Sequence, residues 1–336
     1  MQIISQNIRG LKNDDRIKEL TLMLHRRNIF MACVQETWRT GSETLDGNYG
    51  YRLVLSGKKR QTSNRGSLGV GIVLSPKSID AWKAAGCELH CISARVMAIR
   101  LLMVDSQNKT IGLYVVSAYA PIGVAAEIEW NNFFDDIDTC ISKKLSNDIL
   151  IIGSDTNSSM GCYTRTIDDT SYCMGQFGLP YANDAGKRFA SHLAINNLLA
   201  VTTCFRKNEY ATWIHPRSKL KHQTDHFIVK KEHFRYIMDA DITQTLIDSD
   251  HTAIMCKLRL ISRLKKKSSS RDQLIRLDYS QLKSDVERDN FCMKVLEKYH
   301  DKTVTNSQYT NLVEAIITVS HSTFSQRKKT ITRVVR

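Results

Sequence analysis

The chain of 336 residues lacks any hydrophobic run that approaches the length of a membrane span. A transmembrane helix needs about 20 consecutive apolar residues, so the sequence argues against a helical membrane protein. Because its first residues already have the pattern of a β-strand, we expect no signal peptide. The hydrophobic content of 42% is ordinary for a globular protein with a buried core.

Glycine patterns of the common nucleotide-binding folds are also absent, and there is no internal repeat. The lack of a Walker loop and of a Rossmann fingerprint argues against P-loop and dinucleotide-binding enzymes. The length allows one large α/β domain with a smaller appendage, or two domains.

The nine cysteines are odd in number and scattered along the chain. Cys87 and Cys91 are close in sequence, but no second pair at metal-ligand spacing completes a zinc site. The pattern therefore disfavours structural zinc and a disulfide framework, and it predicts reduced thiols of a cytosolic or nuclear protein.

Basic residues outnumber acidic ones, 48 to 34, giving a formal net charge of +14. The last 76 residues contribute +8 of this excess. Such a balance favours a polyanionic partner, nucleic acid or an anionic membrane surface, although simple solubility would explain it too.

The first 36 residues predict a strand, an amphipathic helix and a second, buried strand. The spacing is that of a βαβ unit, with polar residues at the carboxyl ends of both strands. Later apolar runs predict further strands, and residues 127–145 and 184–197 predict helices whose aromatic and aliphatic stripes face a core.

A long basic loop separates the predicted strands near residues 51–55 and 68–74. Its cations could bind a phosphate backbone, or the loop could simply be solvated. The residues concerned are Lys58, Lys59, Arg60 and Arg65.

The composition changes after residue 260. Residues 261–272 predict a basic, Ser-rich linker, and residues 273–336 predict helices. On one helix Leu282, Val286, Met293 and Leu296 form the expected apolar face, and on the next Tyr309, Leu312, Val313, Ile316 and Ile317 do so. This tail could dock nucleic acid or a polymerase, or be a loosely packed linker.

Polar residues recur at the ends of the predicted strands. In open α/β folds ligands bind at the carboxyl ends of the strands. Carboxylate and amide oxygens suit a hard cation such as Mg²⁺, and histidine, tyrosine and amide groups can donate to a phosphoryl group. The candidates are Asn7, Glu36, Tyr119, Asp155, Asn157, Asp225, Asp250 and His251.

Each candidate has a structural alternative. Asn and Asp after strands commonly form turns or caps, Tyr119 could be a core ring, and His251 could be a hydrogen-bonded structural histidine. Their joint recurrence favours a shared site.

Seven segments in order resemble motifs of the endonuclease/exonuclease/phosphatase superfamily. Within it they are most similar to the apurinic-type endonuclease domain of RTE-clade non-LTR retrotransposons and their craniofacial development protein 2-like relatives. The resemblance covers residues 2 to about 260, with the segments 5–10, 35–37, 117–121, 153–157, 212–213, 223–226 and 249–251. It implies an α/β fold of two packed β-sheets flanked by helices, a four-layer sandwich, in residues 1–260, with a C-terminal helical extension.

The resemblance also implies roles. Glu36 would be the main Mg²⁺ ligand, with Asn7 and Asp250 beside it, and Mn²⁺ could substitute. Asp155 would orient or activate water, Asn157 and Tyr119 would contact phosphate, and His251 would donate to a phosphate oxygen while Asp225 holds its imidazole. We expect DNA contacts from Arg9, Trp213 and the basic loop.

Two positions depart from the family pattern. Ser154 replaces a usual glycine, which would strain the loop if that residue needs a positive φ. Thr224 replaces a usual isoleucine before Asp225. Neither change removes a catalytic group, so activity is expected to be retained.

The expected function is Mg²⁺-dependent DNA nicking, as for target-site cleavage in retrotransposition. The alternatives are a phosphatase acting on inositol phosphates or lipids, and a domesticated, non-catalytic nucleic-acid or chromatin binder. No polymerase motif is present, so the chain resembles a fragment or stand-alone remnant of a polyprotein whose reverse transcriptase domain is a candidate partner. We expect a monomer that acts in the nucleus on DNA, without membrane association.

Overall fold

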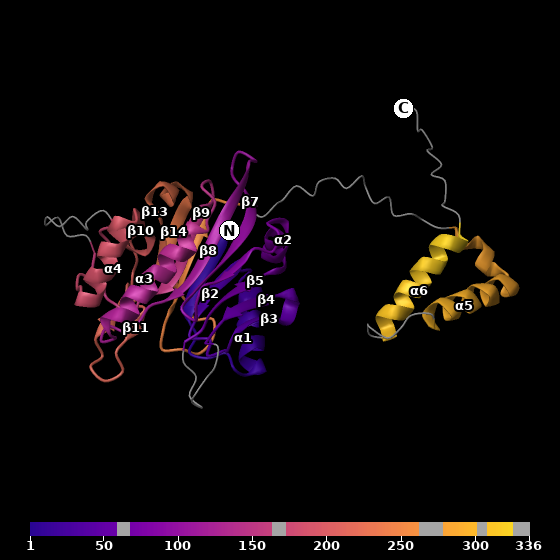
Figure 1. The fold of residues 1–336 in the computed structure, drawn as a ribbon, viewed down its shortest axis with the longest axis horizontal. Coiled ribbons are helices and arrows are strands. Elements are labelled where there is room, and N and C mark those ends of the chain that lie inside the picture. Colours follow the sequence, from indigo (N-terminus) through magenta and orange to yellow (C-terminus); the bar gives the residue numbers. More distant parts are fainter. Residues whose placement is uncertain (59–67, 163–172, 262–277, 301–307, 325–336) are drawn as a thin grey trace. The chain divides into compact units, whose positions relative to one another are not determined.

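The computed structural model describes residues 1–58, 68–162, 173–261, 278–300 and 308–324. The chain divides into two compact units, Met1–Leu264 and Lys265–Arg336 (Figure 1). In the described residues no helix combines the length and apolarity needed to cross a bilayer. Most of the predicted linker, residues 262–272, lies outside the described part of the chain.

Two β-sheets form the first unit. The seven-stranded sheet has, in spatial order, β14 (Ile237–Thr243), β15 (Ala253–Leu258), β1 (Gln2–Asn7), β2 (Met31–Gln35), β5 (Val70–Leu74), β4 (Arg52–Ser56) and β3 (Ser42–Asp46). The six-stranded sheet has β10 (Leu198–Ala200), β13 (Asp225–Lys230), β9 (Ile149–Asp155), β8 (Thr110–Tyr119), β7 (Val96–Val104) and β6 (Leu89–Cys91). A small third sheet pairs β11 (Trp213–Ile214) with β12 (Lys221–His222).

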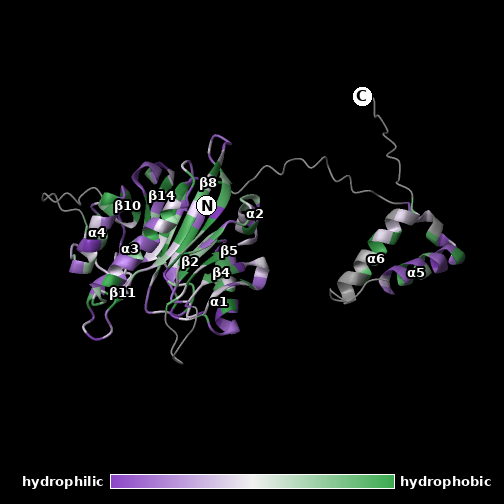
Figure 2. Cartoon of the chain, in the orientation of Figure 1, coloured by the Kyte–Doolittle hydropathy of each residue, from purple (hydrophilic) through white to green (hydrophobic). Residues whose placement is uncertain are grey.

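Helices cover the outer faces of both large sheets. The apolar stripe of α1 (Asp14–Arg26) packs on the seven-stranded sheet, while α3 (Glu127–Ser142) and α4 (Asp184–Ile195) pack on the six-stranded sheet. The two sheets bury their inner faces against each other, and α2 (Pro76–Ala84) packs at the edge of that core. This arrangement confirms the predicted four-layer α/β sandwich, and Figure 2 shows its strands to be largely hydrophobic.

Local sequence explains where the helices begin. The side chain of Asn13 accepts from two backbone N–H groups in the first turn of α1, and Asn183 caps α4 in the same way. Ser75 caps α2, whose first residue is Pro76. No periodic pattern in the sequence predicts β3, α2, β6 or β14, which are short or lie at sheet edges.

The topology brings four strand ends to one edge of the sandwich. β1 and β2 are parallel, with Asn7 opposite Gln35, and β8 and β9 are parallel, with Tyr119 opposite Asp155. The antiparallel strand β13 begins beside them, because Asp225 pairs with Asp155. Polar residues that are far apart in sequence are therefore held together by rigid sheet geometry.

A polar contact joins the sheets just behind this edge. The Gln35 amide nitrogen shares its two protons among the hydroxyls of Ser5 and Ser117 and the carbonyl of Gly153, which lie 3.1–3.3 Å away. A Cβ at Gly153 would lie 2.8 Å from the Cβ of Cys33 in the facing sheet. Glycine at this position thus permits the sheets to approach closely.

The condition for strain at Ser154 is not met. Ser154 lies within β9, pairs with both neighbouring strands and is not among the residues with positive φ. Serine is accommodated here without backbone strain, because this position belongs to the strand and not to the following loop.

The second unit contains a 3₁₀ turn (Tyr279–Lys283) and two helices, α5 (Asp285–His300) and α6 (Gln308–Thr323). The helices are present as predicted, but their contact face differs. Val295, Ala315 and Val319 are buried between them, whereas Val286, Met293, Leu296, Leu312, Ile316 and Ile317 are exposed within this unit. The buried stripe between the helices is narrow, and it includes the small side chain of Ala315.

Folding holds His233 in its neutral form. The ring is buried, and its Nδ1 accepts the backbone N–H of Leu150 at 3.1 Å. Burial lowers the pKa of His233 from 6.5 to about 4, although Glu232 opposes the shift. The unfolded chain therefore takes up a proton at higher pH than the native state does.

We predict that the free energy of unfolding falls as the pH is lowered from 6.5 towards 4. His233→Asn, which keeps an acceptor but cannot titrate, should flatten this dependence relative to the exposed control His25→Asn. Urea unfolding at a series of pH values measures both slopes. An unchanged slope in His233→Asn would contradict the assignment.

Candidate active site

Asn7 and Glu36 lie at the centre of the strand-end cluster. The Asn7 amide nitrogen donates to Oε1 of Glu36 and to Oδ2 of Asp155, each at 2.9 Å. The same Glu36 oxygen accepts the hydroxyl proton of Tyr119 at 2.8 Å. A single carboxylate is thus oriented by side chains from both sheets.

Asp155, Asp225 and His251 form a second, buried part of the cluster. His251 Nδ1 lies 3.0 Å from Oδ2 of Asp225, and its Nε2 lies 3.9 Å from Oδ2 of Asp155. Both carboxylates are fully buried and the imidazole is nearly so. The histidine therefore bridges two carboxylates, one on each ring nitrogen.

Burial and charge shift the pKa values of this group. Burial raises the pKa of Asp155 to about 7, although the nearby His251 opposes the shift. Burial alone would lower the pKa of His251, but Asp225 and Asp155 outweigh it and raise the value to about 10. The imidazole is accordingly a cation at neutral pH, with a proton on each nitrogen.

The hydroxyl at Thr224 supports this arrangement. Thr224 Oγ1 donates to Oδ2 of Asp225 at 3.0 Å, and the backbone N–H of Asp225 donates to the hydroxyl of Thr212 at 3.1 Å. The substitution that departs from the family pattern thus adds a hydrogen bond to the carboxylate that holds His251.

Asp250 has partners different from those expected of a metal ligand. Its Oδ2 lies 2.8 Å from Nη1 of Arg9 and accepts the indole N–H of Trp213 at 3.2 Å. Asp250, Arg9 and Trp213 line the same pocket as Glu36. A metal ion bound by Asp250 would compete with the Arg9 guanidinium for the same carboxylate oxygen. The ligand role of Asp250 remains a prediction.

Two residues expected to contact phosphate are engaged within the protein. The Asn157 amide nitrogen donates to the carbonyl of Ala120 at 2.8 Å, and its backbone N–H donates to Asp155. Tyr119 gives its one hydroxyl proton to Glu36. The Asn157 side chain also forms a hydrogen bond with Tyr119, and Tyr119 positions Glu36 in this state.

Three site residues have left-handed backbone conformations, with φ of 45° at Arg9, 53° at Glu36 and 46° at Asn157. Such conformations cost of order 1 kcal/mol or more for residues other than glycine. The turns after β1 and β2 stabilise each other, since Gly10 N–H donates to the Glu36 carbonyl at 2.7 Å. Backbone strain is therefore concentrated at the residues whose side chains meet in the candidate active site.

The cluster opens into a pocket of about 370 Å³. Of the predicted residues, Lys58 is exposed and is not among the pocket's lining residues, while Lys59, Arg60 and Arg65 lie outside the described residues. The structure therefore brings together the predicted catalytic and metal residues with Arg9 and Trp213. Those lining the pocket are Arg9, Glu36, Tyr119, Asn157, Trp213, Asp250 and His251.

Sequence reasoning missed two side chains that shape the site. The indole N–H of Trp38 donates to Oε2 of Glu36 at 3.2 Å, and the Arg95 guanidinium lies over the Tyr119 ring, 5.5 Å from its centre. Trp38 follows the Gln-Glu-Thr segment directly, which could have drawn attention to it. No local signal marks Arg95.

Two sets of residues could hold a divalent cation. Ligand atoms of Asp155, Asp225 and His251 lie within 4.8 Å of one another, but a cation there would have to displace the proton on the imidazole. Glu36 is partly exposed at the pocket, and its carboxylate oxygens suit Mg²⁺. The donor chemistry therefore fits a hard cation at Glu36 better than at the buried group.

Comparison with known proteins shows the same fold. The endonuclease domain of TRAS1, a telomere-specific non-LTR retrotransposon, matches 77% of this chain and 98% of its own length, with a TM-score of 0.51 and 15% identity. The catalytic domain of Xenopus laevis APE2 matches 78% of this chain and 92% of its own, with a TM-score of 0.55 and 14% identity. The chain has the α/β sandwich of the endonuclease/exonuclease/phosphatase enzymes.

Among curated proteins, craniofacial development protein 2 of Bos taurus is 26% identical over 258 residues, which is 76% of this chain. This chain spans about 40% of that relative's length. No family model matches the sequence.

We predict that Asp225→Ala destabilises the protein by roughly 3–5 kcal/mol, because it leaves the buried His251 cation without its main partner. Asp239→Ala is the matched control, since it removes the carboxylate of a half-exposed pair with Lys257. The control should cost under about 1 kcal/mol. Urea unfolding measures both, and equal losses would contradict a buried ion pair.

Proposed function

We propose that this chain is a metal-dependent endonuclease that hydrolyses phosphodiester bonds in DNA. The supporting observation is the convergence of Glu36 and His251 at one pocket, with the buried Asp155 beside them and Asn7 and Asp225 orienting the group. The sandwich is shared with nucleases, and the charge of +14 favours a polyanionic substrate.

His251 acts as a charged hydrogen-bond donor. Asp225 fixes the ring through Nδ1, so Nε2 presents its proton towards Asp155 and the pocket. A non-bridging oxygen of a phosphodiester that enters the pocket would accept a hydrogen bond from this N–H group. The interaction strengthens as negative charge accumulates on the phosphorus oxygens.

Asp155 orients the attacking water. Asn7 and the Asn157 backbone N–H hold its two oxygens, so the carboxylate has a fixed orientation in which it can accept a proton from water. The Asn157 side chain is held by the Ala120 carbonyl and the Tyr119 hydroxyl, which keeps the residue beside the phosphate position.

Glu36, with Asn7 beside it, is the residue proposed to hold Mg²⁺, and Mn²⁺ is an alternative. When bound, such a cation neutralises charge on the phosphoryl group and on the leaving oxygen. Trp38 and Tyr119 keep the Glu36 carboxylate in place by donating to its two oxygens.

DNA would be bound by the rim of the pocket. Arg9 and Trp213 lie on that rim, and the segment between β11 and β12 carries exposed Lys219 and Leu220. Basic side chains contact phosphates without sequence preference, and aromatic rings can stack on bases. We further propose that the chain acts in the nucleus, and that a reverse transcriptase is its partner in a longer polyprotein.

The central prediction is Mg²⁺-dependent nicking of supercoiled plasmid. Glu36→Ala and His251→Ala should each reduce the nicking rate by roughly a hundredfold or more, because each removes stabilisation of the transition state. Glu19→Ala and His25→Ala change exposed residues of α1 and should leave the rate unchanged. Conversion of supercoiled to open-circular DNA on agarose gels gives the rates.

Assays of plasmid nicking, phosphate release and DNA binding together decide between the competing functions. Hydrolysis of inositol phosphate or a phospholipid without plasmid nicking would identify a phosphatase. The similarity to craniofacial development protein 2 supports a domesticated, non-catalytic nucleic-acid binder as the alternative function. Salt-dependent DNA binding without cleavage in Mg²⁺ or Mn²⁺ would establish that alternative.

We predict that Trp213→Ala weakens binding of duplex DNA about tenfold, equivalent to ~1.4 kcal/mol. Tyr49→Ala removes an exposed aromatic ring away from the pocket and serves as the control. Fluorescence anisotropy in the presence of EDTA measures affinity without cleavage. Equal affinities of the two variants would place the DNA elsewhere.

A further inference from the structure

A second cavity, of about 880 Å³, lies at the other end of the strands that form the candidate active site. It is lined by the turn between β7 and β8, by the residues that precede β9, and by the end of the 3₁₀ segment Lys231–Tyr236. Ile111 of β8 lines it, whereas Tyr119 of the same strand lines the candidate active site. At 3.3 Å per residue the two lie about 25 Å apart, so the cavities are separate.

One wall of this cavity is built from a buried ion pair. Arg100 donates to both oxygens of Asp148, at 2.7 and 2.9 Å, and Asp148 is only 2% exposed. A Cβ at Gly112 would overlap the Asp148 carboxylate, so glycine in β8 makes room for the pair. The wall is therefore preformed on rigid strands.

The remaining charges of the cavity are mainly positive. Lys109, Arg235 and Arg259 line it, and within the described residues none of them forms an ion pair. The other acidic residue, Asp105, uses Oδ1 to accept two backbone N–H groups of its own turn. With Arg100 and Asp148 cancelling, the lining carries a net charge of about +2.

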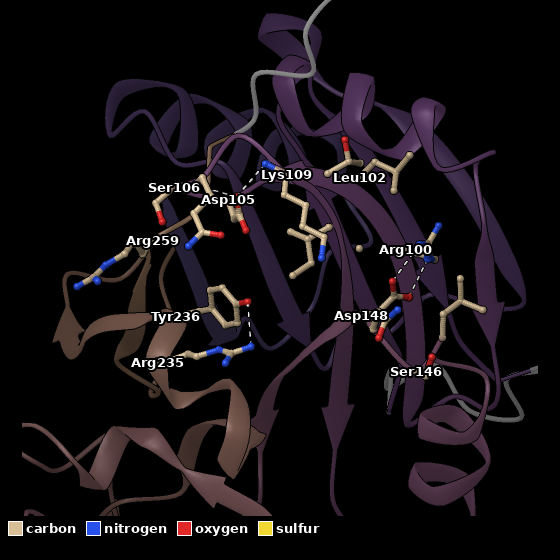
Figure 3. A pocket seen from close by; sticks show the side chains of 16 residues that line it. Arg100, Leu102, Asp105, Ser106, Lys109, Ser146, Asp148, Arg235, Tyr236 and Arg259 are labelled. Atoms are coloured by element: carbon tan, nitrogen blue, oxygen red, sulfur yellow. Dashed lines mark hydrogen bonds and ion pairs between the residues drawn. The ribbon is translucent and has the colours of Figure 1, made fainter.

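Aromatic and amide groups accompany these cations. Figure 3 shows the Tyr236 ring and the Lys109 side chain pointing into the cavity, across from Arg100 and Asp148. The Arg235 guanidinium lies 5.0 Å from the centre of the Tyr236 ring and donates to its hydroxyl. The side-chain amides of Gln107 and Asn147 complete the lining, and no hydrogen bond of theirs is formed with the described residues.

We propose that this cavity binds a nucleotide unit, either free or within a single strand, and that it does so independently of the candidate active site. The cations are placed to bind the phosphate, the Tyr236 ring with Arg235 over it can contact the base, and the two amides can pair with base edges. An acidic peptide would use the cations but not the ring and the amides. The volume is in the range of small-molecule sites.

The test uses the full chain in EDTA, with fluorescein-labelled oligothymidylate as the strand and thymidine monophosphate as the free nucleotide. The double variant Lys109→Glu/Arg259→Glu should weaken strand binding at least tenfold and lower the salt slope of log affinity by about 1.4, the value for two phosphate contacts. Lys77→Glu/Lys83→Glu makes the same charge change on exposed residues of α2 and should have less than a twofold effect. Thermal melting checks that all variants are folded.

Two further measurements locate the ligand and identify its source. A strand containing iodouracil should crosslink to Tyr236 under ultraviolet light, and plasmid nicking should be unaffected by the double variant. Competition by thymidine monophosphate at concentrations comparable to those of the strand would identify the free nucleotide as the ligand, and much weaker competition would identify the strand. Equal binding by the two double variants, or equal affinity for polyglutamate and the strand, would overturn the proposal.

Discussion

The side-chain amide of Asn7 holds the two halves of the candidate active site together. Its two protons go to Glu36, at the end of β2 in one sheet, and to Asp155, at the end of β9 in the other. Carboxylates this close would repel each other if nothing lay between them. A neutral donor at the end of β1 thus permits these two acidic groups to lie close together.

Behind Asn7, the interface between the sheets is itself adapted to the site. Gln35 crosses from one sheet to hydroxyl and carbonyl groups of the other, and the missing side chain at Gly153 lets the strands approach. Close packing leaves little freedom for these strands to slide. The strained turns at Arg9 and Glu36 are consistent with this rigidity, because only a firm surrounding structure keeps such conformations populated.

The two ends of the sandwich differ in how they use charge. At the candidate active site, acidic groups are oriented by neutral donors and by the His251 cation, which suits catalysis on a phosphate with help from a metal. At the opposite end, the acidic groups are taken up by Arg100 and by backbone N–H groups, so the cations remain available. The same pair of sheets therefore supports two cavities of unlike electrostatics about 25 Å apart, one at each end of its strands.

The sequence alone determined the alternating strands and helices, the stripes of α1, α3 and α4, and the residue types at the strand ends. These are local properties, since apolar periodicity and helix caps depend on residues that are neighbours in sequence. The ordered motifs added the four-layer sandwich and the candidate residues from Asn7 to His251 by resemblance.

Only the tertiary structure decided which of these groups touch. It paired Asp250 with Arg9, gave the Tyr119 proton to Glu36, added Trp38 and Arg95 to the site, and placed Ser154 within a strand. It also selected Val295, Ala315 and Val319 as the contact between α5 and α6 over the more apolar stripes. Such outcomes depend on distances between residues that are remote in sequence, and no local pattern encodes those distances.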